Sequence, residues 1–175
     1  QCQEEEGIDN SCMDRYFVQE NAMTLSLPQS MPGPHRELLN SLVDGLRSDE
    51  RIVAVAAGGS YLTDSMDEYS DLDLVVVVDP ASFNQVIGDR ERIAAALGPL
   101  LVAFTGEHVG EPRLLICLYG PDPLLHVDLK FISLADIAER VEDPAVLWER
   151  EGQLTLAYAG STPLFPERDP QWIED

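Results

Sequence analysis

Two aspartates stand directly before the most apolar stretch of this sequence. Asp71 and Asp73 flank Leu72, and residues 74–78 follow without a polar side chain. Such a run is typical of a strand buried on both faces of a sheet, and the strand period of two puts both aspartates on one face, about 6.6 Å apart. Unpaired carboxylates are costly to bury, so we expect a cation beside them; the alternative is an exposed strand end that water solvates.

A Gly-Gly-Ser turn precedes these aspartates. Residues 51–59 are typical of a buried strand that Gly58 and Gly59 close, and Ser60 stands where a helix is expected to begin. Glycines permit a tight turn, Ser60 can cap the helix, and the N–H groups left free at a helix start can bind phosphate oxygens. Taken without its context, such a turn is more often structural.

A third carboxylate interrupts the later apolar run at residues 124–132, where Asp128 lies within an expected core strand. If this strand neighbours residues 71–79, three carboxylates meet at one place. Such a cluster can bind two metals, or one metal and a general base, and magnesium is the candidate ion because it takes carboxylate and phosphate oxygens. His126 and Lys130 share the face of Asp128 and can contact phosphates; the alternative is a structural role on a strand edge.

The remaining patterns predict an α/β (α+β) fold in which helices flank a mixed β-sheet. Residues 1–33 lack sustained periodicity and are expected to be a tail, with Met23 as a candidate natural start and residues 1–22 as an added segment. Residues 34–175 are expected to be one domain. Strands are predicted at 51–59, 71–79, 100–105, 113–120, 124–132 and 154–160, and helices from Pro34, over 82–97, around 134–141 and near 144–150.

Charge restricts the partners of this chain. There are 32 acidic and 11 basic side chains, for a formal net charge of −21. A nucleic acid would be repelled, whereas a cationic small molecule would be attracted; the alternative is that the acid mainly serves solubility. No apolar run is long enough to cross a bilayer, and three cysteines without metal or redox spacing favour a reducing cytoplasm.

These motifs resemble those of the polymerase-beta-like nucleotidyltransferases. The pattern is an apolar strand, Gly59-Ser60, ten residues (61–70), Asp71-Leu72-Asp73 in a second apolar strand, and a later Asp128. Within that superfamily the chain looks most like the small bacterial enzymes that include aminoglycoside and lincosamide resistance proteins.

The resemblance implies a nucleotidyltransferase fold and the transfer of a nucleoside monophosphate, AMP from ATP, to a hydroxyl of a small molecule. It implies Mg²⁺ and a nucleoside triphosphate as cofactors. The turn at Gly58, Gly59 and Ser60 would hold the triphosphate. Asp71 and Asp73 would hold the metals, and Asp128 would bind metal or take the acceptor proton.

Many relatives continue into a helical region that helps to form the acceptor pocket, whereas this sequence stops soon after its last expected strand. A second subunit in a homodimer is therefore expected to complete the site. The alternative interpretation is an antitoxin-like minimal nucleotidyltransferase that binds, or nucleotidylates, a helical partner toxin.

Overall fold

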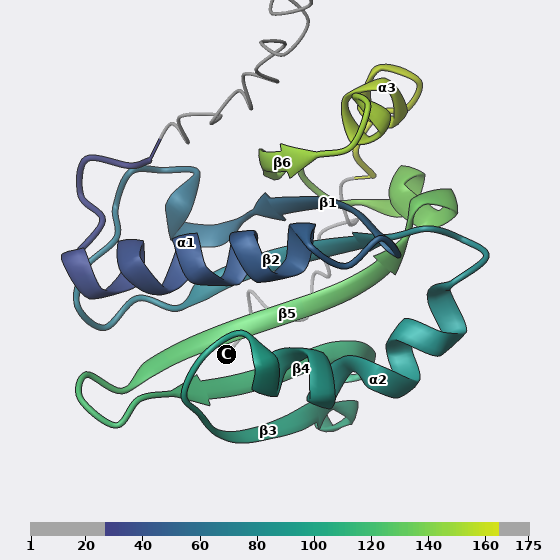
Figure 1. Ribbon diagram of the computed structural model, residues 1–175. Coiled ribbons are helices and arrows are strands. Elements are labelled where there is room, and N and C mark those ends of the chain that lie inside the picture. Colours follow the sequence, from purple (N-terminus) through teal and green to yellow (C-terminus); the bar gives the residue numbers. More distant parts are fainter. Residues whose placement is uncertain (1–26, 165–175) are drawn as a thin grey trace, which may run out of the picture.

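The computed structural model describes residues 27–164, which form a six-stranded sheet with flanking helices (Figure 1). The strand order is β3-β4-β5-β2-β1-β6; β2 and β5 pair in parallel, and every other neighbouring pair is antiparallel. The sheet is mixed, as predicted. The elements are α1 (Gly33–Arg47), β1 (Ile52–Ala57), η1 (Gly59–Tyr61), β2 (Leu72–Val78), α2 (Phe83–Ala96), β3 (Leu100–Gly106), η2 (Glu107–Val109), β4 (Glu111–Tyr119), β5 (Leu125–Ser133), η3 (Leu134–Glu139), β6 (Ala145–Glu149) and α3 (Gln153–Ala159), where η marks a 3₁₀ helix.

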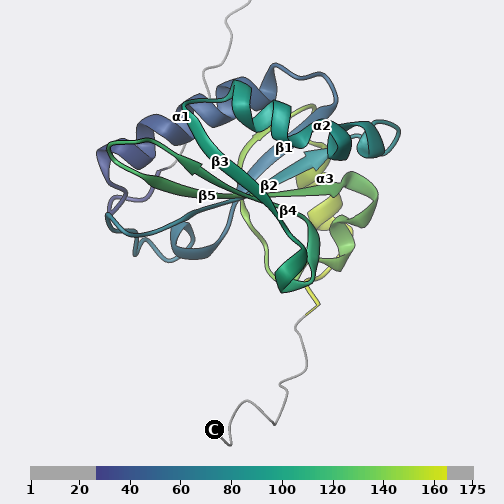
Figure 2. The same ribbon diagram turned by 90° about the horizontal axis from the view of Figure 1, so that it is seen from below.

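One face of the sheet is covered by α1 and α2, which lie on the same side in both views (Figures 1 and 2). The helix predicted from Pro34 is α1, and its apolar stripe places Leu39, Leu42 and Leu46 completely out of solvent. These leucines join Val76, Leu129 and other inward side chains of the strands in the larger core cluster. Burial of each leucine stabilises the fold by roughly 1.5–3 kcal/mol.

The opposite face is covered over only part of its width within the described residues. There α3 and η3 pack on β1 and the adjoining strands through a smaller apolar cluster that includes Val53, Val77, Ile137 and Leu154. Across β5 and β4, the same face carries partly exposed polar and apolar side chains. This less covered region is where the carboxylates lie.

Two predicted elements near the C-terminus are wrong. The segment at 144–150, expected to be helical, is strand β6, because Val146 and Trp148 pair with the otherwise free edge of β1. The expected strand at 154–160 is helix α3, in which Leu154, Ala157 and Tyr158 pack together on the smaller core cluster. Those three positions follow the i, i+3, i+4 spacing of a helix face. The helical prediction at 134–141 is confirmed as η3.

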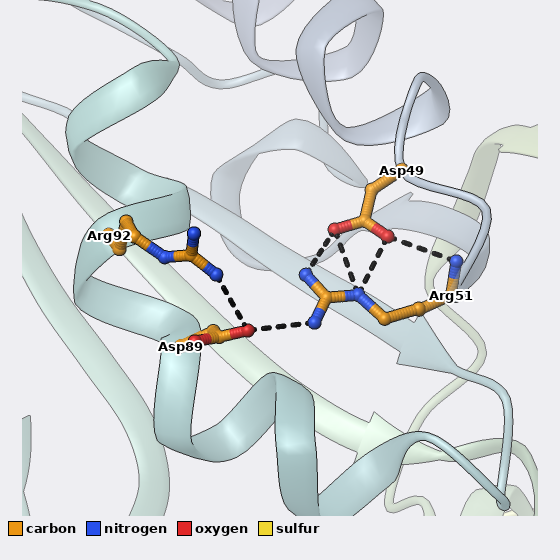
Figure 3. Close-up of polar contacts among 4 residues, drawn as sticks. All are labelled: Asp49, Arg51, Asp89 and Arg92. Carbon is orange, nitrogen blue, oxygen red and sulfur yellow. Dashed lines mark hydrogen bonds and ion pairs between the residues drawn. The ribbon is translucent and has the colours of Figure 1, made fainter.

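A network of ion pairs links α2 to the turn before β1 (Figure 3). Arg51 donates to both oxygens of Asp49, at 2.6 Å from Nη2 and 2.9 Å from Nε, and through Nη1 to Asp89 at 2.8 Å. Arg92 contacts the same Asp89 oxygen at 2.9 Å. Hydrogen bonds from the Arg51 guanidinium lower the pKa of both aspartates. The turn before β1 is thereby tied to the helix that follows β2.

The expected tail at 1–33 falls mainly outside the described residues. In its described part, Met31 is 3% exposed and packs into the larger core cluster. None of the helices formed by residues 27–164 has the length and apolar character that crossing a membrane requires.

Candidate active site

The parallel pairing of β2 with β5 brings the predicted carboxylates to one place. Asp73 stands opposite Asp128 in the strand register. Asp71 lies one residue before β2, which begins at Leu72, and its side chain is exposed; the predicted strand began one residue too early here. The prediction that the three carboxylates meet required these two strands to be neighbours in the sheet. The pairing of β2 with β5 meets that condition.

The glycine turn fits closely around Asp73. Gly58 donates its N–H to the carbonyl oxygen of Asp73 at 2.9 Å. Gly59 has φ +58°, and a Cβ added there would lie 2.1 Å from Oδ2 of Asp73. Only glycine suits this position, because both the backbone conformation and the neighbouring carboxylate exclude a side chain.

Ser60 does not cap a helix as the sequence predicted. It lies inside η1, whose N-cap is Gly58, and no side chain caps this short helix. The helix begins two residues earlier than expected, with Gly58 in place of Ser60 as its N-cap, and Gly59 enters it with a positive φ. The backbone N–H groups of Gly59 and Ser60 stand at the start of η1, where a helical turn offers them no internal acceptor.

His126 lies between two of the carboxylates. Its Nδ1 is 2.9 Å from Oδ1 of Asp71, and its Nε2 is 3.0 Å from Oδ1 of Asp128. The second approach is close without being a directed hydrogen bond, since Nε2 of His126 and Oδ1 of Asp128 are both buried and both lack a hydrogen-bond partner. The imidazole therefore separates Asp71 from Asp128 and leaves a buried carboxylate oxygen unsatisfied.

Burial and like charge perturb the two strand aspartates. Desolvation raises the pKa of Asp73, and the charges of Asp128 and Asp71 raise it further. Desolvation also raises the pKa of Asp128, and His126 partly opposes this effect. Ionised carboxylates in this arrangement repel one another, so a bound cation would relieve an unfavourable interaction.

A cavity of about 430 Å³ opens beside these groups. Gly58, Gly59, Asp73 and Asp128 line one part of it. Glu142, from the loop between η3 and β6, also lines it, and Oε1 of Glu142 lies 3.1 Å from the position of a Cβ added to Gly58. The turn, the strand carboxylates and this loop thus share one open pocket.

Residues 39–109 match the family model described as a nucleotidyltransferase domain. This match supports a nucleotidyltransferase domain of the polymerase-beta-like superfamily in this segment. The match covers less than half of the chain, and it includes the glycine turn, Asp71 and Asp73. Asp128 lies beyond it, so its place beside Asp73 comes from the register of β2 and β5. No curated protein matches the chain.

General nucleotidyl transfer is the activity that a nucleotidyltransferase domain supports, and such domains typically use a nucleoside triphosphate with a divalent metal. Within residues 27–164, no group of three or more His, Cys, Asp or Glu side chains is arranged to hold a metal ion as it stands. The imidazole of His126 lies within 3.0 Å of an oxygen of both Asp71 and Asp128. In kind, however, the residues fit a hard divalent cation: carboxylate oxygens are its preferred ligands, and one buried oxygen of Asp128, although close to His126, accepts no hydrogen bond.

The pocket beside Asp73 contains residues that sequence reasoning did not place there. Nothing in the sequence indicated that Glu142 lines this pocket, because its segment adjoins β6, which was predicted to be helical. Glu111 begins β4 and carried no motif. The contact of His126 with Asp71 was missed, although the alternation of β5 had already put His126 on the face of Asp128.

Proposed function

We propose that this protein is a magnesium-dependent nucleotidyltransferase that moves a nucleoside monophosphate, AMP from ATP, to a hydroxyl of a small molecule. The observation that carries the proposal is the register of β2 and β5, which sets Asp73 beside Asp128 at a pocket that the Gly58–Gly59 turn also lines. In this reaction the acceptor oxygen attacks the α-phosphorus, the bond from that phosphorus to the bridging oxygen breaks, and pyrophosphate leaves.

The residues take distinct roles in this reaction. Asp71 and Asp73 would hold the divalent ion, which would neutralise charge on the triphosphate when bound. Gly59 and Ser60 direct backbone N–H groups to the phosphates, whereas the N–H of Gly58 is already donated to Asp73. Asp128 orients the acceptor hydroxyl and takes its proton, a role that its raised pKa suits.

The acceptor is proposed to be cationic or rich in hydroxyl groups, as aminoglycoside and lincosamide antibiotics are. The net charge of −21 favours a cation. We also propose that the reaction takes place in the cytoplasm, since Cys117 is a buried free thiol, in keeping with a reducing compartment.

A second candidate is an antitoxin-like module that binds, or nucleotidylates, a helical partner protein. Exposed apolar side chains on β3 favour it. Val102 and Phe104 are 45% and 44% exposed, and their partners in β4 are Leu118 and Ile116. These two partners stand opposite His126 and Asp128 of β5, so the apolar surface adjoins the carboxylates.

One experiment tests both candidates. The protein is incubated with Mg²⁺, each of the four nucleoside triphosphates labelled at the α-phosphate, and a panel of aminoglycosides, lincosamides and helical proteins. Mass spectrometry then identifies the product. A small molecule heavier by one nucleotide supports the first candidate, and a labelled protein with no labelled small molecule supports the second. Absence of transfer to every acceptor, with no triphosphate binding, contradicts the first candidate and the nucleotidylating form of the second.

A further inference from the structure

Lys130 is the single lysine of the sequence, in which the other ten basic residues are arginines. It is also the one basic side chain in the lining of the pocket that the described residues form around Asp73. The ionisable groups that share this lining with it are the carboxylates of Asp73, Glu111, Asp128 and Glu142. A polyanionic ligand in this pocket therefore has one side-chain cation to contact.

One ion pair, to a carboxylate that a second cation also binds, holds this lysine at the pocket wall. Its Nζ lies 3.0 Å from Oε2 of Glu111, and Arg113 binds both oxygens of the same carboxylate, at 2.8 Å from Nε and 3.0 Å from Nη2. These contacts, with the Arg113 hydrogen bonds as the largest cause, lower the pKa of Glu111 to about 2. The side chain of Lys130 nevertheless stays 42% exposed, so its ammonium remains accessible to a ligand.

Lys130, Glu111 and Arg113 form a triad whose charges do not cancel. Glu111 carries one negative charge, and Lys130 and Arg113 each carry one positive charge, so the group is positive in a strongly acidic protein. Lys130 lines both the pocket of Asp73 and the neighbouring cavity, whereas Arg113 lines only the neighbouring cavity. Of the two cations, Lys130 is therefore the one that a ligand in the pocket of Asp73 can contact.

The position of Lys130 along β5 matches an extended anion. It follows Asp128 by two residues on the same face, which separates their Cα atoms by about 6.6 Å. We infer that Lys130 binds the terminal phosphates of the nucleoside triphosphate, and the pyrophosphate that leaves, while the α-phosphorus lies near Asp73 and Asp128. This inference rests on the proposed function and adds a residue that the family match at 39–109 does not include.

A single lysine permits a direct chemical test. The aldehyde of pyridoxal 5′-phosphate condenses with a free amine, water leaves, and borohydride reduces the imine to a stable adduct that peptide mass mapping locates. Labelling of Lys130 should fall as a nucleoside triphosphate with Mg²⁺ is added, with half-protection at the dissociation constant measured by calorimetry. Labelling of the N-terminal amine, read in the same digest, is the internal control. Undiminished labelling at saturating nucleotide would overturn the inference.

Variants give an independent measure. Lys130→Met should weaken triphosphate binding and raise the half-inhibitory concentration of pyrophosphate by about 10- to 100-fold, the range for loss of a hydrogen bond to a charged group. Lys130→Arg should retain most of the affinity. The matched control is Arg113→Met, which removes the other cation of the triad and should leave triphosphate affinity within about threefold. Equal losses in the two Met variants would assign Lys130 a purely structural role and overturn the inference.

The two possible failures are distinguishable. If nucleotide binds and is transferred while neither labelling nor Lys130→Met responds as described, the inference about Lys130 fails and the proposed function stands. If no nucleoside triphosphate binds at all, both fail together.

Discussion

Replacing Gly59 with alanine tests whether the close contact between Gly59 and Asp73 is needed for metal-nucleotide binding. The residue has φ +58°, and a non-glycine residue in that region costs about 1–2 kcal/mol. The new Cβ would also meet Oδ2 of Asp73 at 2.1 Å, far inside van der Waals contact, so the carboxylate must turn away. Asp73 is proposed to be a metal ligand, and disturbing the groups that orient such a ligand typically lowers metal affinity about 10- to 100-fold. Gly59→Ala should therefore lose both stability and metal-nucleotide binding.

Gly110 provides the matched control. Its φ is +78°, but a Cβ there meets nothing within 4 Å. Gly110→Ala should thus show a similar loss of about 1–2 kcal/mol in urea unfolding measured in EDTA, with unchanged binding of nucleotide and Mg²⁺ by calorimetry. If Gly59→Ala binds nucleotide and Mg²⁺ as tightly as the wild type, the role assigned to the contact between Gly59 and Asp73 is refuted. The same holds if Gly110→Ala loses as much affinity as Gly59→Ala.

Two further predictions concern the strand aspartates. Asp128→Asn should lower turnover by about 100- to 10,000-fold with little change in nucleotide affinity; a shifted melting temperature with an intact rate per folded molecule would make Asp128 structural instead. Asp73 has a raised pKa in the folded state, so its ionised form destabilises the metal-free protein, and this penalty disappears as pH falls through that pKa. Asp73→Asn should therefore melt at a higher temperature than wild type at pH 7 in EDTA, and the difference should shrink toward about pH 4; a variant that melts lower at pH 7 would contradict this.

Local patterns predicted most of the fold because each element has a clear period. The leucine stripe from Pro34 and the valine run after Asp73 depend on residues close in sequence, and both appear as α1 and β2. The failures at 144–150 and 154–160 have another cause: these short segments take the structure that their tertiary neighbours permit, β1 for the first and the smaller core cluster for the second.

The residues of the candidate site likewise fall into two groups, those that local patterns indicated and those that depend on tertiary contacts. Spacing indicated Gly59, Asp73 and Asp128, because a turn and a strand alternation are local features. Nothing local indicates that Glu142 lies over Gly58, since that contact depends on the path of the loop between η3 and β6. The contact of His126 with Asp71 likewise required the parallel pairing of two strands that are distant in sequence.

Calorimetric titration of the wild-type protein with each nucleoside triphosphate, once with Mg²⁺ and once with EDTA, tests the central claim most directly. Carboxylates that line the pocket repel phosphates unless a cation intervenes. We predict saturable binding of at least one triphosphate with Mg²⁺ and none with EDTA. Tight binding in EDTA, or no binding of any triphosphate with Mg²⁺, would contradict the assignment of these aspartates to a metal-dependent nucleotide site.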